Sequence, residues 1–145
     1  MEQVATDPRS GILIVDDKAD NRMLLATRIE IDPRLRVVGE AANGSEAIVR
    51  ARETRPDAVI LDLEMPGMDG YTAIPILRTV NPAMRILVFS GYGDTHSHRL
   101  EGAAKPDGQV VKGADLRVLM QQLNTLLEEK PDDVMFCDLG EVPLQ

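Results

Sequence analysis

Carboxylate, hydroxyl and amine side chains follow the short apolar runs of this sequence, one run after another. They are Asp16 and Asp17 after residues 11–15, Asp62 after 59–61, Ser90 after 86–89, and Lys112 after 110–111. Adjacent carboxylates repel each other unless a cation or a positive side chain lies between them. Their oxygens suit a hard divalent cation, and a lysine offers a point positive charge to phosphoryl oxygens. The pattern therefore predicts one site that holds a hard cation and a phosphoryl group.

The apolar runs themselves predict how these side chains are positioned. Short runs rich in β-branched residues are typical of strands buried on both faces, in a parallel sheet covered by helices. The expected strands are 11–15, 36–41, 59–61, 85–90 and 110–111. Because helical segments separate them, the strands should be parallel and joined by right-handed crossovers. Ligands of such sheets bind just beyond the carboxyl ends of the strands, where the five side chains fall.

Helical spacing of apolar residues predicts five helices. Asp20 and Asn21 can cap the first helix. Its inward-facing residues are expected to be Leu24, Leu25 and Ile29. These residues would pack the helix against one face of the sheet.

The later helices differ in the strength of their signals. Residues 43–46 open the second, and Pro75 is expected to weaken or bend the third because proline removes a backbone donor. The fourth is expected within residues 93–108, where few apolar residues could face inward. The last has leucine and methionine at three- and four-residue steps over 116–127, which predicts a strongly amphipathic helix.

With these elements in place, the chain resembles the receiver domain of two-component response regulators over about residues 10–130. The residues that carry the resemblance are Asp16, Asp17, Asp62, the loop 65–70, Ser90 and Lys112. The resemblance implies a flavodoxin-like, doubly wound α/β fold with five parallel strands in the order 2-1-3-4-5. It also implies that Asp62 accepts a phosphoryl group from a histidine kinase or a histidine phosphotransfer protein.

The residue chemistry agrees with that expectation. A carboxylate such as Asp62 can attack phosphorus to give an acyl phosphate. An anionic nucleophile that meets an anionic phosphoryl group needs charge compensation, which Mg²⁺ provides through oxygen ligands. The expected ligands are Asp17 and Asp62 directly, Asp16 directly or through water, and the backbone carbonyl of Glu64. Lys112 would neutralise phosphoryl oxygens, and Ser90 would donate a hydrogen bond to one of them.

Some positions depart from the family pattern. Gln109 stands where an aromatic residue is usual on the fifth strand, and Gly113 replaces the proline that usually follows the lysine. The fourth helix is short and polar and contains His96 and His98. Two histidines without a third partner are a weak metal signal, so we expect both to be exposed to solvent. These departures predict an intact chemical site with an altered readout.

Composition limits the class of protein and its partners. The chain has 145 residues, a formal net charge of −8 and one cysteine, Cys137. The acidic balance argues against binding of nucleic acid, which needs a basic face. A single cysteine fits a reducing cytoplasm, and no segment predicts a signal peptide or a membrane span. We expect a disordered lead-in over residues 1–10, a receiver domain over 11–130 and a C-terminal tail over 131–145.

Two other functions remain alternatives on the sequence. A pseudo-receiver would bind partners without being phosphorylated, as Gln109 and the weak fourth helix would allow. A phosphohydrolase with an aspartyl-phosphate intermediate would use Asp62 and an acid two residues later, which Glu64 imitates. The sequence contains no output domain, so we expect a stand-alone receiver, with a fragment of a longer regulator as the alternative. Whether the protein is an enzyme stays open, because a receiver mainly assists its own phosphorylation and dephosphorylation.

Overall fold

The fold is built around a five-stranded parallel sheet in the order β2-β1-β3-β4-β5. The structure is a computed structural model, which describes residues 7–91, 93 and 98–129. The strands are β1 (Ser10–Val15), β2 (Leu35–Ala41), β3 (Ala58–Leu61), β4 (Arg85–Ser90) and β5 (Gly108–Val111). The predicted flavodoxin-like sheet and its strand order are therefore confirmed.

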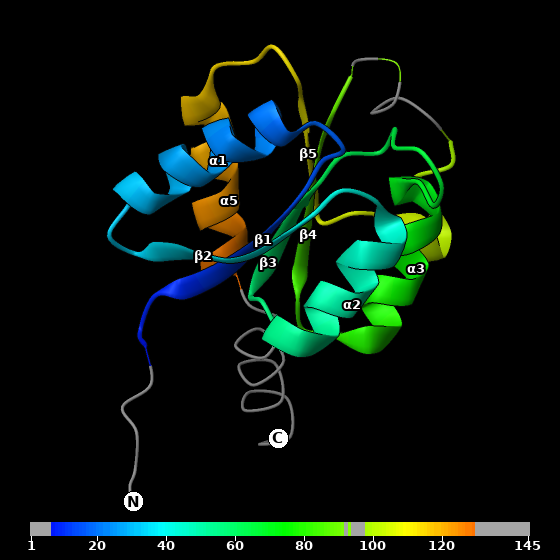
Figure 1. The fold of residues 1–145 in the computed structure, drawn as a ribbon, viewed down its shortest axis with the longest axis horizontal. Helices are drawn as coiled ribbons and strands as arrows, with labels where there is room; N and C mark the ends of the chain where they lie inside the picture. The colour runs from blue at the N-terminus through cyan, green and yellow to red at the C-terminus, as the bar shows by residue number, and fades with distance from the viewer. Residues whose placement is uncertain (1–6, 92, 94–97, 130–145) are drawn as a thin grey trace, which may run out of the picture.

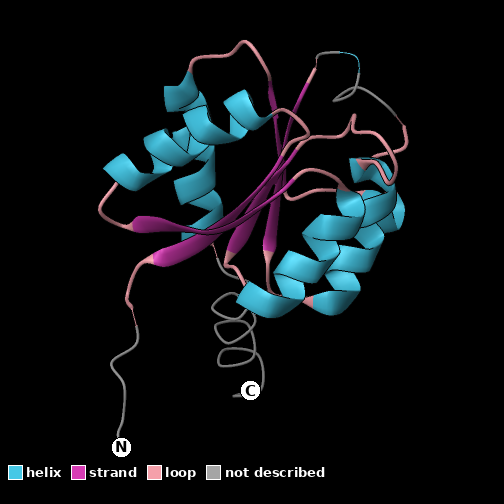
Figure 2. Cartoon of the chain, viewed as in Figure 1, coloured by secondary structure: helices cyan, strands magenta, loops and turns pink. Residues whose placement is uncertain are grey.

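Helices cover both faces of the sheet, as Figures 1 and 2 show. On one face lie α1 (Ala19–Ile31) and α5 (Leu116–Glu128), and on the other lie α2 (Gly44–Thr54) and α3 (Gly70–Val80). Alternate residues of each strand point to opposite faces. Leu13 and Val15 pack in the core under α2 and α3, whereas Ile12 and Ile14 pack in the core under α1 and α5. The strands are apolar on both faces because both faces are buried.

The structure describes four of the five expected α-helices. Between β4 and β5, the described residues include Gly93, which is helical, and one turn of 3₁₀-helix, η1 (Gly102–Ala104). Leu100 is buried there, but Ala103 is exposed, so few apolar contacts support a longer helix. Residues 92 and 94–97 of the expected fourth helix lie outside the described residues, and so does the expected tail over 131–145.

Helix α1 differs from the prediction in its cap and in its buried face. Lys18 occupies the N-cap position and makes no side-chain cap hydrogen bond, so Asp20 lies inside the first turn. Leu25 and Ile29 are buried as predicted, but Leu24 is 56% exposed. Residues four apart share one helix face, whereas consecutive residues do not. Once Leu25 and Ile29 face the sheet, Leu24 must point away from it.

Asp and Asn side chains cap the other helices. Asn43 accepts a hydrogen bond from the Glu46 backbone N–H at the start of α2, and Asp69 accepts one from the Thr72 backbone N–H at the start of α3. Asp115 caps α5 in a similar way. Helix α3 continues through Pro75 without a break. These caps fix the helix starts next to the carboxyl ends of the strands.

Gly70 is the point at which α3 meets the end of β3. Its backbone N–H donates to the Leu63 carbonyl at 3.0 Å. A Cβ at this position would collide with the carbonyl oxygen of Asp62 and lie 2.9 Å from the Leu63 Cα. Only glycine allows this close approach of the two backbones.

We expect Gly70→Ala to lower the free energy of unfolding by about 1–3 kcal/mol, because backbone atoms cannot move aside cheaply. The matched control is Gly93→Ala, where a Cβ would meet nothing within 4 Å. That control should change stability by less than about 0.5 kcal/mol. Urea denaturation measures both variants. Equal stabilities for the two would show that the approach at Gly70 is not tight.

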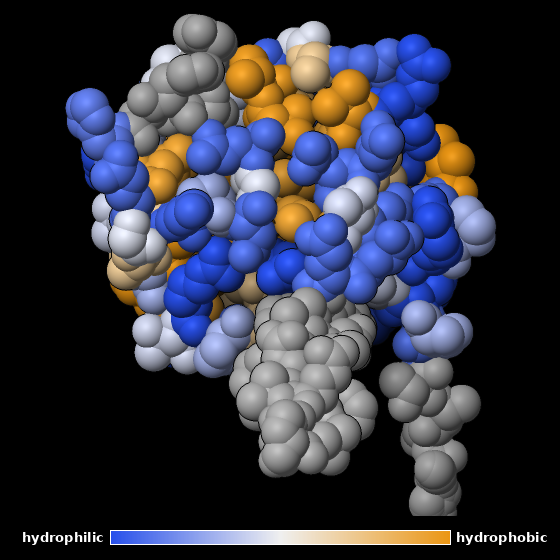
Figure 3. Space-filling view, turned by 180° about the vertical axis from the view of Figure 1, so that it is seen from behind, coloured by the Kyte–Doolittle hydropathy of each residue, from blue (hydrophilic) through white to orange (hydrophobic). Residues whose placement is uncertain are grey.

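The surface is mostly polar, with isolated large apolar side chains. Figure 3 shows one face on which hydrophilic residues surround a group of hydrophobic ones. The most exposed large apolar residues among those described are Met23 at 68% and Ile31 at 65%, both on α1. None of the described helices has the length and apolar character needed to cross a membrane.

Candidate functional site

Three carboxylates meet at the carboxyl ends of β1 and β3. Asp16 and Asp17 directly follow β1, and Asp62 directly follows β3. Each offers an oxygen within 4.8 Å of an oxygen of the other two. Asp16 and Asp62 are only 2% and 5% exposed, while Asp17 is half-buried. The strand ends therefore bring together the three acids that the sequence predicts as one cluster.

Lys112, which follows β5, reaches across the end of β4 to this cluster. Its Nζ lies 2.7 Å from Asp16 Oδ2 and 3.2 Å from Asp62 Oδ2. The side chain is 29% exposed, so the two ion pairs are partly shielded from water. One ammonium thus compensates part of the charge of two nearly buried carboxylates.

Ser90, the last residue of β4, is fully buried beside Asp62. Its hydroxyl Oγ donates to Asp62 Oδ1 at 2.8 Å and accepts the Leu63 backbone N–H at 3.3 Å. The Glu64 backbone N–H also points to Asp62 Oδ1, at 3.4 Å. The hydroxyl and this backbone N–H hold one oxygen of Asp62, while Lys112 faces the other.

Burial and charge set the protonation of the site. Burial raises the pKa of Asp62 above its ordinary value, although the hydrogen bond from Ser90 and the charge of Lys112 work in the opposite direction. Burial would lower the pKa of Lys112, but the hydrogen bond to Asp16 and the charges of Asp62 and Asp16 outweigh it. The pKa of Lys112 is therefore raised, and its ammonium keeps its charge at neutral pH.

The cluster has the composition of a divalent cation site. Three ionised carboxylates and one ammonium leave two uncompensated negative charges, which one divalent ion would match. Oxygen ligands are those that Mg²⁺ prefers, and Mg²⁺ commonly retains several waters beside a few carboxylates. The donors Asp16, Asp17 and Asp62 therefore fit the expected Mg²⁺. The ligand role of the Glu64 carbonyl stays a prediction, and the side chain of that residue is exposed.

Two residues that contact Asp16 were not predicted to be part of the site. Asn21 Nδ2 donates to Asp16 Oδ2 at 3.3 Å, and Arg22 Nη1 donates to the Asp16 backbone carbonyl at 2.6 Å. Arg22 also pairs with Glu40 at 3.1 Å. Asn21 was expected to cap α1, but it lies inside the first turn of the helix, where it faces Asp16. The five- and six-residue spacing from Asp16 across a strand-to-helix turn was the available signal.

The departures from the family pattern have identifiable places. Gln109 is exposed on β5, and Gly113 has φ +101°, a conformation that proline cannot adopt. His98 is exposed as expected, whereas His96 and Cys137 lie outside the described residues. Among the described residues, the acidic cluster is the one group of three or more potential metal ligands.

Comparison with known proteins identifies a common family. A sequence profile described as response regulator receiver domain matches residues 12–124. A protein-glutamate methylesterase/protein-glutamine glutaminase of Syntrophomonas wolfei is 33% identical over 112 residues, which cover 71% of this chain and 32% of that protein. A protein of the same name from Myxococcus xanthus is 42% identical over 89 residues, or 61% of this chain and 24% of its own length. The chain thus spans about a third or less of these relatives.

Solved structures agree with the sequence comparison. The response regulator domain of Thermotoga maritima CheB superimposes with a TM-score of 0.76 at 25% identity, covering 85% of this chain and 99% of that domain. A two-component response regulator of the LuxR family from Aurantimonas superimposes with a TM-score of 0.73 at 32% identity, covering 94% and 99%.

Proposed function

This chain belongs to the family of response regulator receiver domains, and from that premise we propose that it accepts a phosphoryl group on Asp62. One observation supports this most strongly: the Asp62 carboxylate lies between the Ser90 hydroxyl at 2.8 Å and the Lys112 ammonium at 3.2 Å. Two further carboxylates, Asp16 and Asp17, complete a divalent cation site beside it.

The proposed reaction is transfer from a phosphohistidine. An oxygen of Asp62 attacks phosphorus, an O–P bond forms, and the N–P bond of the donor breaks. The electron pair of that bond goes to the imidazole nitrogen, and the imidazole leaves as a neutral group after it takes a proton from water. Lys112 faces Asp62 and compensates the negative charge that the three phosphoryl oxygens bring. Ser90 is close enough to turn its hydroxyl from the carboxylate to one of those oxygens.

The metal of the proposed reaction is Mg²⁺, held by Asp17 and Asp62, with Asp16 acting directly or through water. When bound, Mg²⁺ would neutralise charge on the phosphoryl oxygens and orient them for in-line attack. The residues of this chain keep the carboxylates together before binding. Asp16 is held by Lys112, by Asn21 and by the Lys18 backbone N–H at 2.9 Å.

The proposed partners follow from the same chemistry. A histidine kinase or a histidine phosphotransfer protein would supply the phosphoryl group, and a downstream protein would read the changed surface. Both encounters would take place in the cytoplasm, where a chain with one cysteine needs no disulfide. The relatives that carry a methylesterase name extend well beyond the third or less of their length that this chain matches, so their activity is not part of this proposal.

Asp17→Asn tests the metal assignment. We expect this variant to bind Mg²⁺ at least about tenfold more weakly and to be phosphorylated correspondingly more slowly at limiting Mg²⁺. Calorimetric titration with Mg²⁺ and the rate of labelling by acetyl phosphate measure the two effects. Asp20→Asn is the matched control, because it removes the same charge from an exposed position in α1. Phosphorylation of Asp17→Asn at the rate of the control would contradict the assignment.

A further inference from the structure

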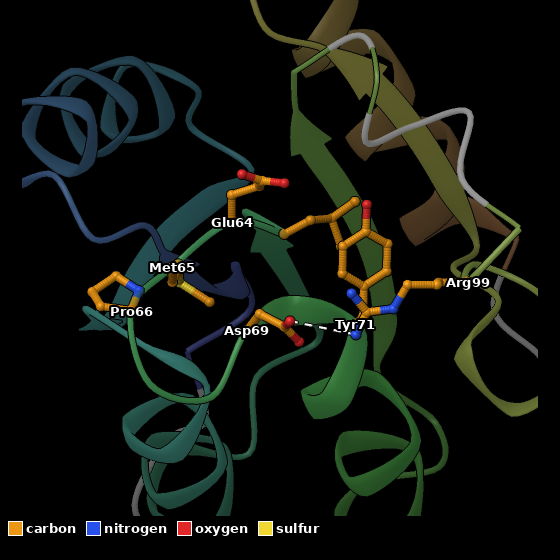
Figure 4. Close-up of a pocket in the computed structure, with 7 residues that line it drawn as sticks. Glu64, Met65, Pro66, Asp69, Tyr71 and Arg99 are labelled. Carbon is orange, nitrogen blue, oxygen red and sulfur yellow. Dashed lines mark hydrogen bonds and ion pairs between the residues drawn. The ribbon is translucent and has the colours of Figure 1, made fainter.

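Arg99, in the segment between β4 and β5, contacts two residues at the start of α3. One is Asp69, the N-cap of α3, at the end of the loop that follows Asp62, and the other is Tyr71. The Arg99 guanidinium lies 4.0 Å from the centroid of the Tyr71 ring, and its Nη2 lies 3.4 Å from Asp69 Oδ2. Figure 4 shows Arg99 across the face of Tyr71, with the ion pair to Asp69 as a dashed line. We call these three residues the Arg99 contact.

The Tyr71 side of this contact is rigidly connected to the phosphoacceptor. Tyr71 follows Gly70, whose backbone touches the Asp62 carbonyl so closely that no Cβ would fit. The Tyr71 side chain is itself buried, and it packs in the core under α2 and α3. If Asp62 shifts relative to the end of β4, the start of α3 therefore has to shift with it.

The Arg99 side is connected to the rest of the fold by its neighbour. Leu100 is 5% exposed and packs in the same core, and η1 packs against α3. The Arg99 side chain is 57% exposed, so its contacts with Tyr71 and Asp69 are weak compared with the buried residues around them. Beside the contact lies a surface hollow of about 350 Å³, lined by Glu64, Tyr71 and Arg99 among others.

At the site itself, Ser90 connects the end of β4 to the residues that follow β3. Its hydroxyl donates to Asp62 Oδ1 and accepts the Leu63 backbone N–H. An acyl phosphate on Asp62 removes the charge of the carboxylate and places stronger acceptors farther from the backbone. The Ser90–Asp62 hydrogen bond therefore belongs to the carboxylate form, and the contact between the end of β4 and the residues after β3 should change when the phosphoryl group arrives.

We propose that the Arg99 contact is a restraint that favours the carboxylate arrangement of the site and so weakens its binding of a phosphoryl group. The inference rests on the proposed function, because it assigns a regulatory role at the same site. A contact that is stronger in one of two arrangements shifts the equilibrium toward that arrangement. An exposed cation–π contact is worth about 0.5–1 kcal/mol, which corresponds to about a twofold to fivefold change in affinity.

Beryllofluoride, a phosphoryl mimic, allows a direct test at fixed Mg²⁺. We expect Arg99→Gln to bind beryllofluoride about twofold to fivefold more tightly than the natural sequence. Tyr71→Phe keeps the ring and should therefore keep the cation–π contact with Arg99, whereas Tyr71→Leu removes that contact and should bind beryllofluoride more tightly. Combining Tyr71→Leu with Arg99→Gln should give less than the sum of the two gains, because both variants lose the cation–π contact. Arg52→Gln, an exposed position on α2, is the control for loss of a positive charge.

The outcomes separate this inference from the function on which it rests. If the natural sequence takes beryllofluoride and Arg99→Gln has the affinity of Arg52→Gln or a lower one, the restraint is wrong and the phosphoacceptor stands. Additive effects of the Tyr71 and Arg99 substitutions would likewise overturn it. If the natural sequence takes neither beryllofluoride nor the phosphoryl group of acetyl phosphate, the proposed function itself fails, and the restraint fails with it.

Discussion

Acetyl phosphate and Mg²⁺ are expected to add one phosphoryl group to Asp62 and none to any other residue. The reason is that the site supplies its own catalytic groups: the nucleophile, the Lys112 ammonium, the Ser90 hydroxyl and the carboxylates that suit Mg²⁺. A small donor therefore needs few contacts of its own. Intact-mass measurement should show the gain of one phosphoryl group, and chelation of Mg²⁺ should abolish it.

Two variants test whether Asp62 is the residue that is labelled. Asp62→Asn keeps the size of the side chain and an acceptor for Ser90, but it cannot form an acyl phosphate, so labelling should fall to background. Glu64→Gln, two residues later and exposed, should be labelled like the natural sequence. Label that persists in Asp62→Asn, or that forms without Mg²⁺, would contradict the assignment.

The same experiment separates the alternative functions. A phosphohydrolase would turn over many equivalents of a phosphate ester and would need an acid such as Glu64, whereas a receiver is labelled stoichiometrically. A pseudo-receiver would not be labelled at all. The acidic cluster and its lysine favour the receiver, because an interaction module has no need of two nearly buried carboxylates around one ammonium.

The sheet and the acidic cluster could be predicted because both depend on short-range patterns. Apolar runs mark strands buried on both faces, and the residue after each run must lie at the carboxyl edge of the sheet. Asp16, Asp62 and Lys112 are separated by dozens of residues, yet strand order alone brings them together. No side-chain detail was needed for that step.

The features that could not be predicted depend on the rotation of helices about their axes and on contacts between segments that are distant in the sequence. Leu24 and Leu25 are equally apolar, and only contact with the sheet decides which one is buried. Asn21 is a residue type typical of helix caps, and only the observed start of α1 at Ala19 places it inside the helix. The approach of Arg99 to Tyr71 joins a residue between β4 and β5 to the first turn of α3, and no sequence period links the two. The segment before β5 has too few apolar residues for its periodicity to define a helix.

The burial of Asp62 also affects the thermal stability of the protein. Burial raises the pKa of this carboxyl in the folded protein, against the opposing effects of Ser90 and Lys112. The folded state therefore binds this proton more tightly than the unfolded state does. Stability falls as the pH rises from the ordinary pKa of an aspartate through the raised one, and the loss persists at neutral pH. An asparagine carries no such cost because it does not ionise.

We therefore expect Asp62→Asn to melt a few degrees above the natural sequence at pH 7 without Mg²⁺, and the difference to shrink below about pH 4. Lys112 keeps its 2.7 Å pair with Asp16 in the variant, so the loss of its 3.2 Å pair with Asp62 should only partly offset the gain. Mg²⁺ at ten times its dissociation constant should stabilise the natural sequence by about 1.4 kcal/mol. It should stabilise Asp62→Asn much less, because one ligand is gone. Thermal melts across this pH range, with and without Mg²⁺, measure both effects. A variant less stable than the natural sequence at pH 7 would mean that the Ser90 and Lys112 contacts outweigh the burial of the charge.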